Sequence, residues 1–423
     1  MNETLRLGRN SLWLLAARVG AQILSLFTIL LARKLGSAGF GEYAFFTTVI
    51  FVGNVLSTFG TDMLFIREIA ARDDLARLPA ALWLQLSLSG LLIAGIILTA
   101  PALPNQRPAA MTALQLYSLA LVPLAFYSIF TTALRGRQRM DLYALLNFAA
   151  ALLQAAVVLI FVADGEGIVT LAWLLLGSQC LLTLLAGWMC TRHITAFWRG
   201  WRFSWADVRA VTTASTPLGA LGFLGMFYQK LSVALLSTLS GAAPTGLFAA
   251  SLRVVEASKS AHQAAFTSLY PMMSQDGAHP SGRATAAIRL SWRLLLAGAV
   301  VLALTLSLLA GPLVSLLYGT GFEAATPVLR ILAWILVPYT VNSFLTLAFV
   351  AGGRARAVSL ALTVSLLGLG LMSLVWIPAY GLEGAAWAAL VAESLQAVAL
   401  LFQSPKTRWL SRAVLALPYR NQQ

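Results

Sequence analysis

The sequence predicts an all-α, polytopic membrane protein with about twelve transmembrane helices. Of its 423 residues, 59% are hydrophobic and only 10% are charged, whereas about 25% of the residues of a soluble domain are charged. The apolar segments are long, continuous and rich in Leu and Ala, without the alternation of membrane β-strands. This composition excludes a soluble enzyme, a disordered chain and a free nucleic-acid-binding domain, although the net charge is +14.

Each predicted span holds roughly 20 mostly apolar residues, the length that crosses a bilayer as a helix. The spans are expected at residues 10–32, 42–64, 79–100, 111–134, 142–163, 168–190, 212–238, 245–273, 290–318, 326–350, 357–378 and 382–402. The first is too long for a signal peptide and lacks a convincing cleavage site, so we expect it to be retained. Pro123 and Pro338 are expected to interrupt the fourth and tenth spans, because proline removes a backbone donor.

The distribution of Lys and Arg predicts the orientation. With the N-terminus inside, 21 of these residues fall in cytoplasmic segments and 3 in outside segments. Cytoplasmic loops carry such an excess, so both termini are expected in the cytoplasm. Cys180 and Cys190 have no metal-binding spacing and are expected to be small buried hydrophobic residues.

The longest basic loop divides six spans from six. The expected segments are an N-terminal six-helix bundle at 1–190, a basic cytoplasmic linker at 191–209, a C-terminal six-helix bundle at 210–404 and a basic cytoplasmic tail at 405–423. The halves are weakly alike: Gly136-Arg137-Gln138-Arg139 follows the fourth span and Gly353-Arg354-Ala355-Arg356 follows the tenth. Parallel repeats of this kind usually hold their site between them, near the membrane midplane.

Ionisable residues at membrane depth are the candidate binding residues. Such a group costs roughly 2.5–3.5 kcal/mol on insertion scales, so it favours a cavity or a partner. In the eighth predicted span four of them recur every three positions: Arg253, Glu256, Lys259 and His262. This spacing also permits ion pairs along the helix, so a structural ion-pair ladder is the alternative to a binding site.

Across the spans, deep cations outnumber deep acids. The candidate substrate-binding residues are Arg18, Lys230, Arg253 and Lys259, and the candidate ion-coupling residues are Glu256, Glu393, Asp62 and His262. A positive excess suits a phosphate or another polyanion, because Arg forks onto phosphate oxygens and Lys acts as a point charge. Snorkelling of Arg18 and Lys230, and bonding of Glu393 within its own bundle, are the alternatives. Arg330 is expected to pair with Glu323 at the outer face.

Proline and glycine in the seventh span predict a hinge or a static kink. Pro217, Gly219 and Gly222 weaken the inner half of this helix. Elsewhere the sequence has no phosphate-binding glycine loop, no paired metal ligands and no large extramembrane domain. We therefore predict no catalytic residues, no metal site and no cofactor, other than a coupling ion such as H+ or Na+.

Motifs along the whole chain resemble those of bacterial polysaccharide flippases, which belong to the multidrug/oligosaccharidyl-lipid/polysaccharide exporter superfamily. Their order and spacing carry the resemblance, since each motif alone is loose. The motifs are Leu31-Ala32-Arg33-Lys34-Leu35-Gly36-Ser37-Ala38-Gly39-Phe40-Gly41-Glu42-Tyr43-Ala44-Phe45, Arg67-Glu68-Ile69-Ala70, Leu134-Arg135-Gly136-Arg137, Leu317-Tyr318-Gly319 and Gly381-Leu382-Glu383-Gly384-Ala385-Ala386.

The resemblance implies two six-helix bundles that form a V-shaped central cavity. It implies a flippase of the bacterial inner membrane that moves an oligosaccharide on undecaprenyl phosphate or diphosphate to the periplasmic leaflet by alternating access. Such a flippase serves the biosynthesis of a surface polysaccharide of the O-antigen type, and an ion gradient drives it. The implied partners are the lipid-linked oligosaccharide, membrane lipids, a glycan polymerase and other polysaccharide-assembly proteins, not nucleic acid. Arg253 matches a common basic position, whereas Gln229 stands where the family often has Asp.

The main alternative is a cation- or proton-coupled multidrug or metabolite exporter of the sister branch. Its substrates are mostly cations and favour an acidic cavity, which the charge count opposes. A major-facilitator transporter is disfavoured because residues 60–67 depart from that family's pattern after the second span. Two further alternatives are disfavoured. A peptidoglycan-precursor flippase typically has two helices more than the twelve predicted here, and a membrane glycosyltransferase or polymerase has a large outside loop with catalytic acids, whereas the outside loops predicted here are short.

Overall fold

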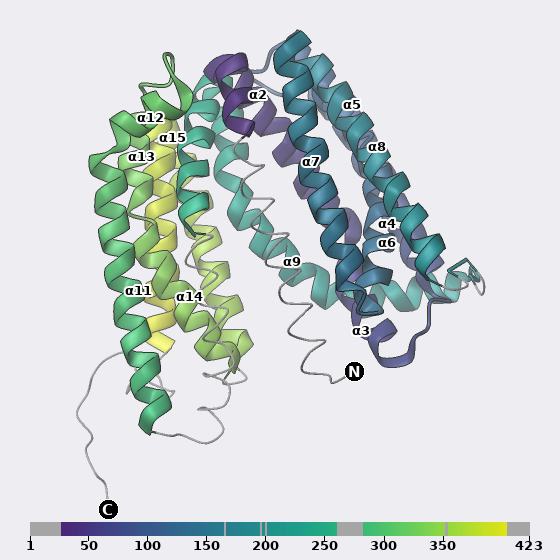
Figure 1. The fold of residues 1–423 in the computed structure, drawn as a ribbon. Coiled ribbons are helices and arrows are strands. Elements are labelled where there is room, and N and C mark those ends of the chain that lie inside the picture. Colours follow the sequence, from purple (N-terminus) through teal and green to yellow (C-terminus); the bar gives the residue numbers. More distant parts are fainter. Residues whose placement is uncertain are drawn as a thin grey trace, which may run out of the picture. The chain divides into compact units, whose positions relative to one another are not determined.

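The computed structural model describes residues 27–164, 166–194, 197–198, 201–259, 282–351 and 354–403. Within these ranges all regular elements are helices, which confirms the all-α fold class (Figure 1). Eight helices of the described ranges are long and apolar enough to cross a membrane, and the bent helix α9 makes nine. The chain is therefore a polytopic membrane protein.

The helices of the first half occupy most of the chain up to residue 240. They are α2 (Phe27–Thr58), α3 (Thr61–Arg72), α4 (Leu78–Thr99), the short 3-10 helix η1 (Ala100–Ala102), α5 (Pro108–Ser118), α6 (Leu121–Gly136), α7 (Met140–Asp164), α8 (Gly167–His193) and α9 (Trp205–Ser240). Residues 242–259 are helical as well. The helices that follow are α11 (Gly282–Leu308), α12 (Ala310–Tyr318), α13 (Ala325–Ala333), α14 (Leu336–Ala351) and α15 (Ala355–Gln403).

Two of these helices contain a glycine that breaks them. The 49 residues of α15 would extend about 75 Å as a straight helix, far beyond a hydrocarbon core of about 30 Å. Gly381, with φ 54° and ψ −127°, breaks it between the predicted spans 357–378 and 382–402. In α2, Gly36 has φ 68° and ψ 178° and breaks the helix between the first two predicted spans. Positive φ is readily available to glycine because it has no Cβ.

The prolines at 123 and 338 interrupt their helices as predicted. Each break lies three to four residues before the proline, between α5 and α6 and between α13 and α14. Proline has no N–H for the carbonyl four residues earlier. The preceding valine donates instead: Val122 N–H bonds Leu119 O at 3.2 Å, and Val337 N–H bonds Trp334 O at 3.2 Å.

Two predicted spans have the wrong ends. The span expected at 42–64 ends at Thr58, because the backbone turns at Phe59 and Gly60, both of positive φ, before α3 begins. The span expected at 290–318 divides at Leu309 into α11 and α12. Pro312, near the start of α12, has no N–H to offer the carbonyl of Leu308. Apolar composition continues through the break at Leu309, so hydropathy alone misses it. The break after Thr58 falls in the short, more polar stretch of residues 57–62, which a window of about 20 residues averages over.

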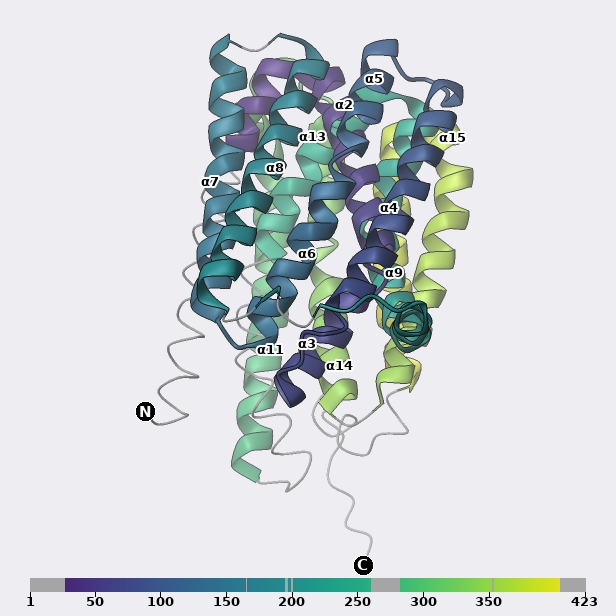
Figure 2. The same ribbon diagram turned by 90° about the vertical axis from the view of Figure 1, so that its right-hand side faces the viewer.

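The chain forms two compact units, Met1–Lys230 and Leu231–Gln423, so α9 contributes to both. In the N-terminal unit, α4, α6, α7 and α8 run alongside one another (Figures 1 and 2). Their core includes Phe65, Ile69, Phe130 and Leu134, all at most 6% exposed.

Part of the predicted linker packs on the N-terminal unit. Phe197 is 2% exposed, and its ring centroid lies 5.8 Å from that of Phe130. At the start of α9, Asp207 forms an ion pair with Arg77 at 3.2 Å. The segment boundaries derived from the sequence stay a prediction.

In the C-terminal unit, α11, α14 and α15 enclose a smaller core. Trp292 of α11 packs against Phe344 of α14, with ring centroids 4.5 Å apart and the ring planes tilted by 38°. Phe349 and Leu400, which are fully buried, complete the contact between α14 and α15.

Candidate functional site

The N-terminal unit carries one of the predicted cations, Lys230, within α9. Its side chain is half-buried, and its Nζ lies 5.4 Å from the centroid of the Phe51 ring on α2. An aromatic face attracts a cation electrostatically without neutralising its charge. Gln229, beside it, is exposed and provides no carboxylate. The Phe51 ring therefore contacts the Lys230 ammonium group without providing a countercharge.

The predicted hinge coincides with a bend in α9. The segments Trp205–Ala220 and Gly222–Ser240 meet at 47°, after Pro217 within the helix. Gly219 lies against the corner between α2 and α3, where an added Cβ would stand 2.8 Å from Phe59 O. A Cβ at Gly222 would meet nothing within 4 Å. The structure therefore shows a bend in α9 at the predicted position, whereas bending of α9 during transport stays a prediction.

In the C-terminal unit, the helix of residues 242–259 carries Arg253, Glu256 and Lys259. Two hydrogen bonds hold this helix in place. Ser251 Oγ donates to Ala325 O at 3.1 Å, and the Tyr318 hydroxyl donates to Ala250 O at 3.0 Å. The three ionisable residues follow these anchors along the same helix, and their positions are therefore set by contacts with α12 and α13.

Burial differs among these three residues. Arg253 and Lys259 are half-buried, whereas Glu256 is exposed. The Nζ of Lys259 lies 4.7 Å from the ring centroid of Tyr339 on α14. Each unit thus places one lysine over an aromatic ring: Lys230 over Phe51 and Lys259 over Tyr339. Neither lysine has a carboxylate within ion-pair distance in the described part of the chain.

Glu393 of α15 is the buried acid of the C-terminal unit. It is 7% exposed, and the Asn342 side chain donates from Nδ2 to both Glu393 Oε1 and Glu393 O at 2.9 Å. Asn342 lies one turn after Tyr339 on α14. Glu393 thus bonds within its own unit, one of the two outcomes considered from the sequence. Asn342 is a residue that sequence reasoning missed, because a lone amide carries no charge signal.

The remaining predicted residues lie elsewhere. Asp62 is half-buried in the first turn of α3, where a carboxylate is favoured by the helix dipole. Arg18 and His262 lie outside the described residues. The described residues contain no group of three or more His, Cys, Asp or Glu side chains that would hold a metal ion.

A second buried acid, Glu42 of α2, was not among the candidates. Its side chain is 1% exposed, and it pairs with the guanidinium of Arg107, which precedes α5. This hydrogen bond, together with the charge of Glu42, raises the pKa of Arg107. The sequence placed Glu42 at the edge of a span, where an acid is usually solvated. The part of α2 after the break at Gly36 begins before residue 42, so Glu42 lies inside the helix instead.

Comparisons with solved structures show the fold. A lipid II flippase, MurJ, in an inward closed conformation is 14% identical, with 95% of this chain and 90% of that chain covered and a TM-score of 0.75. A multidrug resistance MATE family transporter of the MOP superfamily, in an inward-facing conformation, is 15% identical, with 93% and 96% covered and a TM-score of 0.73. A MOP superfamily transporter from Pyrococcus furiosus is 15% identical, with 96% of each chain covered and a TM-score of 0.65.

The sequence comparisons point to a family. No curated protein matches the chain significantly. The family profile described as polysaccharide biosynthesis protein matches residues 7–276, more than half of the chain. With the fold shared by MOP-superfamily transporters, this match confirms the resemblance inferred from the motifs. The chain therefore belongs to the polysaccharide biosynthesis protein family.

Proposed function

We propose that the protein is a flippase that moves an oligosaccharide linked to undecaprenyl phosphate or diphosphate from the cytoplasmic to the periplasmic leaflet. The family match supports a part in polysaccharide biosynthesis, and the fold supports a membrane transporter. In this proposal the protein works by alternating access in the bacterial inner membrane, makes and breaks no covalent bond, and supplies a glycan polymerase and other assembly proteins.

The observation that carries the proposal is the pair of lysines over aromatic rings. Lys230 lies in the candidate membrane-crossing helix α9, and Lys259 lies in the predicted eighth span. An uncompensated cation at this depth is costly, and an aromatic ring offsets about 0.5–2 kcal/mol without removing the charge. A phosphate or diphosphate supplies the missing anion. Arg253, half-buried on the same helix as Lys259, adds a third positive group.

We assign ion coupling to Glu393. Its buried carboxylate is bonded by an amide that suits either protonation state, so it accommodates a proton or Na+. Glu256 is exposed, and Asp62 is half-buried in the first turn of α3, so neither is as well shielded as Glu393. Glu393 is therefore the coupling residue in this proposal.

Complementation of a deletion strain tests the proposal. Deleting the gene is expected to abolish the surface glycan, and the wild-type gene is expected to restore it. The double variant Lys230→Gln, Lys259→Gln is expected to restore much less while inserting normally into the membrane. Lys34→Gln is the matched control, since Lys34 is the other lysine of the described residues and is exposed. Full complementation by the double variant would contradict the role of the lysines.

The second candidate is a cation- or proton-coupled multidrug exporter, which the MATE-type fold favours. It predicts that the deletion strain accumulates a cationic dye such as ethidium and keeps its surface glycan. The flippase proposal predicts the opposite pair of results. The positive excess of the half-buried residues argues against a cationic substrate.

A further inference from the structure

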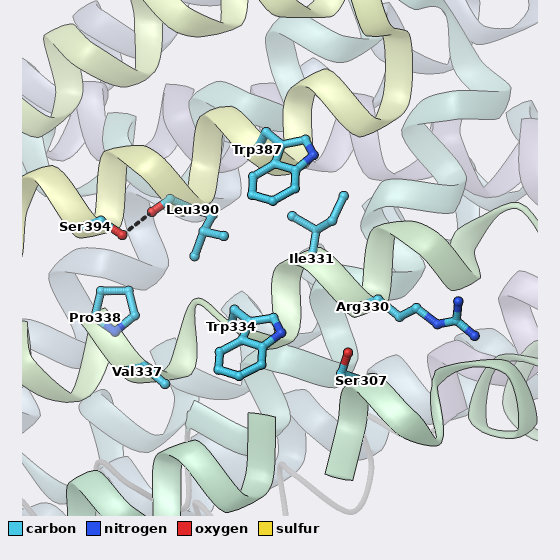
Figure 3. A pocket seen from close by; sticks show the side chains of 9 residues that line it. All are labelled: Ser307, Arg330, Ile331, Trp334, Val337, Pro338, Trp387, Leu390 and Ser394. Atoms are coloured by element: carbon cyan, nitrogen blue, oxygen red, sulfur yellow. Dashed lines mark hydrogen bonds between the residues drawn. The ribbon is translucent and has the colours of Figure 1, made fainter. Parts of the chain in front are cut away.

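The C-terminal unit contains a groove that none of the proposed substrate-binding and ion-coupling residues lines. Its volume is about 600 Å³, within the range of about 300–1,000 Å³ typical of small-ligand sites. It lies between the α13–α14 pair and α15, beside the end of α11. Figure 3 shows the side chains that line it: Ser307, Arg330, Ile331, Trp334, Val337, Pro338, Trp387, Leu390 and Ser394.

Two rows of side chains, one on α15 and the other along α13 and α14, form the walls of the groove. Trp387, Leu390 and Ser394 follow one another at intervals of three and four on α15, so they share one face. Across the groove, Arg330, Trp334 and Pro338 follow at intervals of four along α13 and α14. Trp334 and Trp387 are 38% and 48% exposed, and both indoles lie along the opening in Figure 3.

The helix break at Pro338 lies within this wall. Trp334 and Ile335 form the turn between α13 and α14, and Trp334 and Pro338 both line the groove. Inside a membrane, irregular backbone is tolerated where protein or a cavity covers it rather than lipid tails alone. The break between α13 and α14 therefore lies in a wall of the groove.

Arg330 is the ionisable residue among the nine that line the groove. It lies five residues after the start of α13, about 7–8 Å into the helix. Its guanidinium makes no hydrogen bond or ion pair within the described part of the chain. The predicted partner Glu323 instead accepts a hydrogen bond from Gly321 N–H at 2.9 Å. The expected Arg330–Glu323 pair is absent from the described residues.

We propose that this groove binds an anionic bilayer phospholipid, with the phosphate on Arg330 and an acyl chain between Trp334 and Trp387. A guanidinium forks onto phosphate oxygens, and indoles are typical of the boundary between headgroups and acyl chains. No acidic side chain lines the groove to hold a choline or an amine. The charge of the site thus selects an anionic headgroup over a zwitterionic one. This lipid is a bound component of the membrane and not the transported cargo.

Lipid binding to the purified full-length protein tests this site. Native mass spectrometry with phosphatidylglycerol and phosphatidylcholine is expected to show stronger binding of phosphatidylglycerol. Arg330→Gln is expected to weaken the binding of phosphatidylglycerol about fivefold, since one arginine near a membrane surface contributes about 1 kcal/mol to the binding of an anionic lipid. Arg330→Lys is expected to keep most of the preference. Arg293→Gln, which removes an exposed arginine of α11 in the same unit, is the matched control and is expected to change nothing.

Tryptophan fluorescence tests whether the lipid lies in the groove. Brominated phosphatidylglycerol in nanodiscs is expected to quench the tryptophan fluorescence of the wild-type protein. The quenching that remains in the Trp334→Phe, Trp387→Phe double variant is subtracted, which leaves the quenching of Trp334 and Trp387. Arg330→Gln is expected to reduce the quenching of Trp334 and Trp387 to the level seen with brominated phosphatidylcholine. Equal binding of the two lipids, no effect of Arg330→Gln, or displacement of phosphatidylglycerol by equimolar undecaprenyl phosphate would each overturn the proposal.

Discussion

The two units of the protein hold their buried carboxylates in different ways. In the N-terminal unit, Glu42 is 1% exposed and pairs with the guanidinium of Arg107. In the C-terminal unit, Glu393 is 7% exposed and accepts hydrogen bonds at its side chain and backbone from the amide of Asn342. The two acids are similarly buried, but one is bonded by a cation and the other by a neutral group that donates and accepts.

This difference is the reason why the proposal assigns ion coupling to Glu393 and not to Glu42. A guanidinium only donates hydrogen bonds, so Arg107 provides Glu42 with a countercharge and no acceptor. An amide donates through nitrogen and accepts through oxygen, so Asn342 offers Glu393 both a donor and an acceptor. The Oδ1 of Asn342 is buried without a hydrogen-bond partner within the described structure and remains available as an acceptor. We therefore propose that ion coupling takes place in the C-terminal unit.

The largest expected effect follows from removing the charge of Glu393. Glu393→Gln keeps an acceptor for the Asn342 amide but no longer takes up a proton or Na+. If Glu393 couples the ion, transport should fall by roughly 5- to 150-fold, the range of a coupling energy of about 1–3 kcal/mol. The rate of lipid-linked glycan translocation in proteoliposomes, with and without an ion gradient, measures this loss.

The matched variant is Glu42→Gln in the N-terminal unit. It removes a similarly buried charge, and gradient-driven transport should stay close to wild type. Equal losses in Glu42→Gln and Glu393→Gln would remove the distinction between the two acids.

The next effect concerns stability. Arg107→Ala leaves the Glu42 carboxylate buried without its cation and should destabilise the N-terminal unit by about 2 kcal/mol. This is below the roughly 3–5 kcal/mol for a fully buried pair, because the Arg107 side chain is 64% exposed and solvent screens it. Thermal unfolding in detergent measures the loss. Adding Glu42→Gln should restore part of it, and a double variant no more stable than Arg107→Ala would show that the pair is unimportant.

The lysines extend the comparison to substrate binding. Lys230→Gln and Lys259→Gln should each weaken binding of an undecaprenyl-phosphate ligand about fivefold, since each removes about 1 kcal/mol of attraction. Arginine at either position keeps the charge and should retain most of the binding. Equilibrium binding in nanodiscs measures the change. A loss confined to one unit would mean that the units differ in their cations as well as in their acids.

The smallest effect tests whether the N-terminal unit is static throughout. Gly219→Ala places a Cβ 2.8 Å from Phe59 O and should destabilise the contact between α9 and the corner after α2. Gly222→Ala meets nothing within 4 Å and should stabilise the helix by about 0.5–1 kcal/mol. If α9 bends during transport, Gly222→Ala should slow translocation while raising the unfolding temperature. Unchanged transport would assign the bend a static role.

Hydropathy and proline placement predicted most of the helical architecture. The breaks before Pro123 and Pro338 and at Gly381 lie where the sequence indicated them, because each follows from the local backbone chemistry of one residue. The end of α2 at Thr58 and the division at Leu309 were missed. The division at Leu309 lies within continuous apolar sequence, where a hydropathy window has no signal, and the polar stretch of residues 57–62 is too short to end a span in such a window.

The site was less predictable because it depends on pairing across helices. Charge counting identified Lys230, Lys259 and Glu393, but no sequence rule connects Glu393 to Asn342 or Lys259 to Tyr339 across 51 and 80 positions. The same limitation hid the Glu42–Arg107 pair. Long-range contacts of this kind emerge only when the helices are assembled.

The most direct test of the account is the preference of the purified protein for a phosphorylated carrier. Binding of undecaprenyl-diphosphate oligosaccharide is compared with binding of the same oligosaccharide on uncharged undecaprenol, in wild type and in Lys230→Gln, Lys259→Gln. The account predicts that wild type prefers the diphosphate at least about tenfold and that the double variant loses most of this preference. Equal affinity for the two ligands in wild type, or a preference unchanged in the double variant, would contradict it.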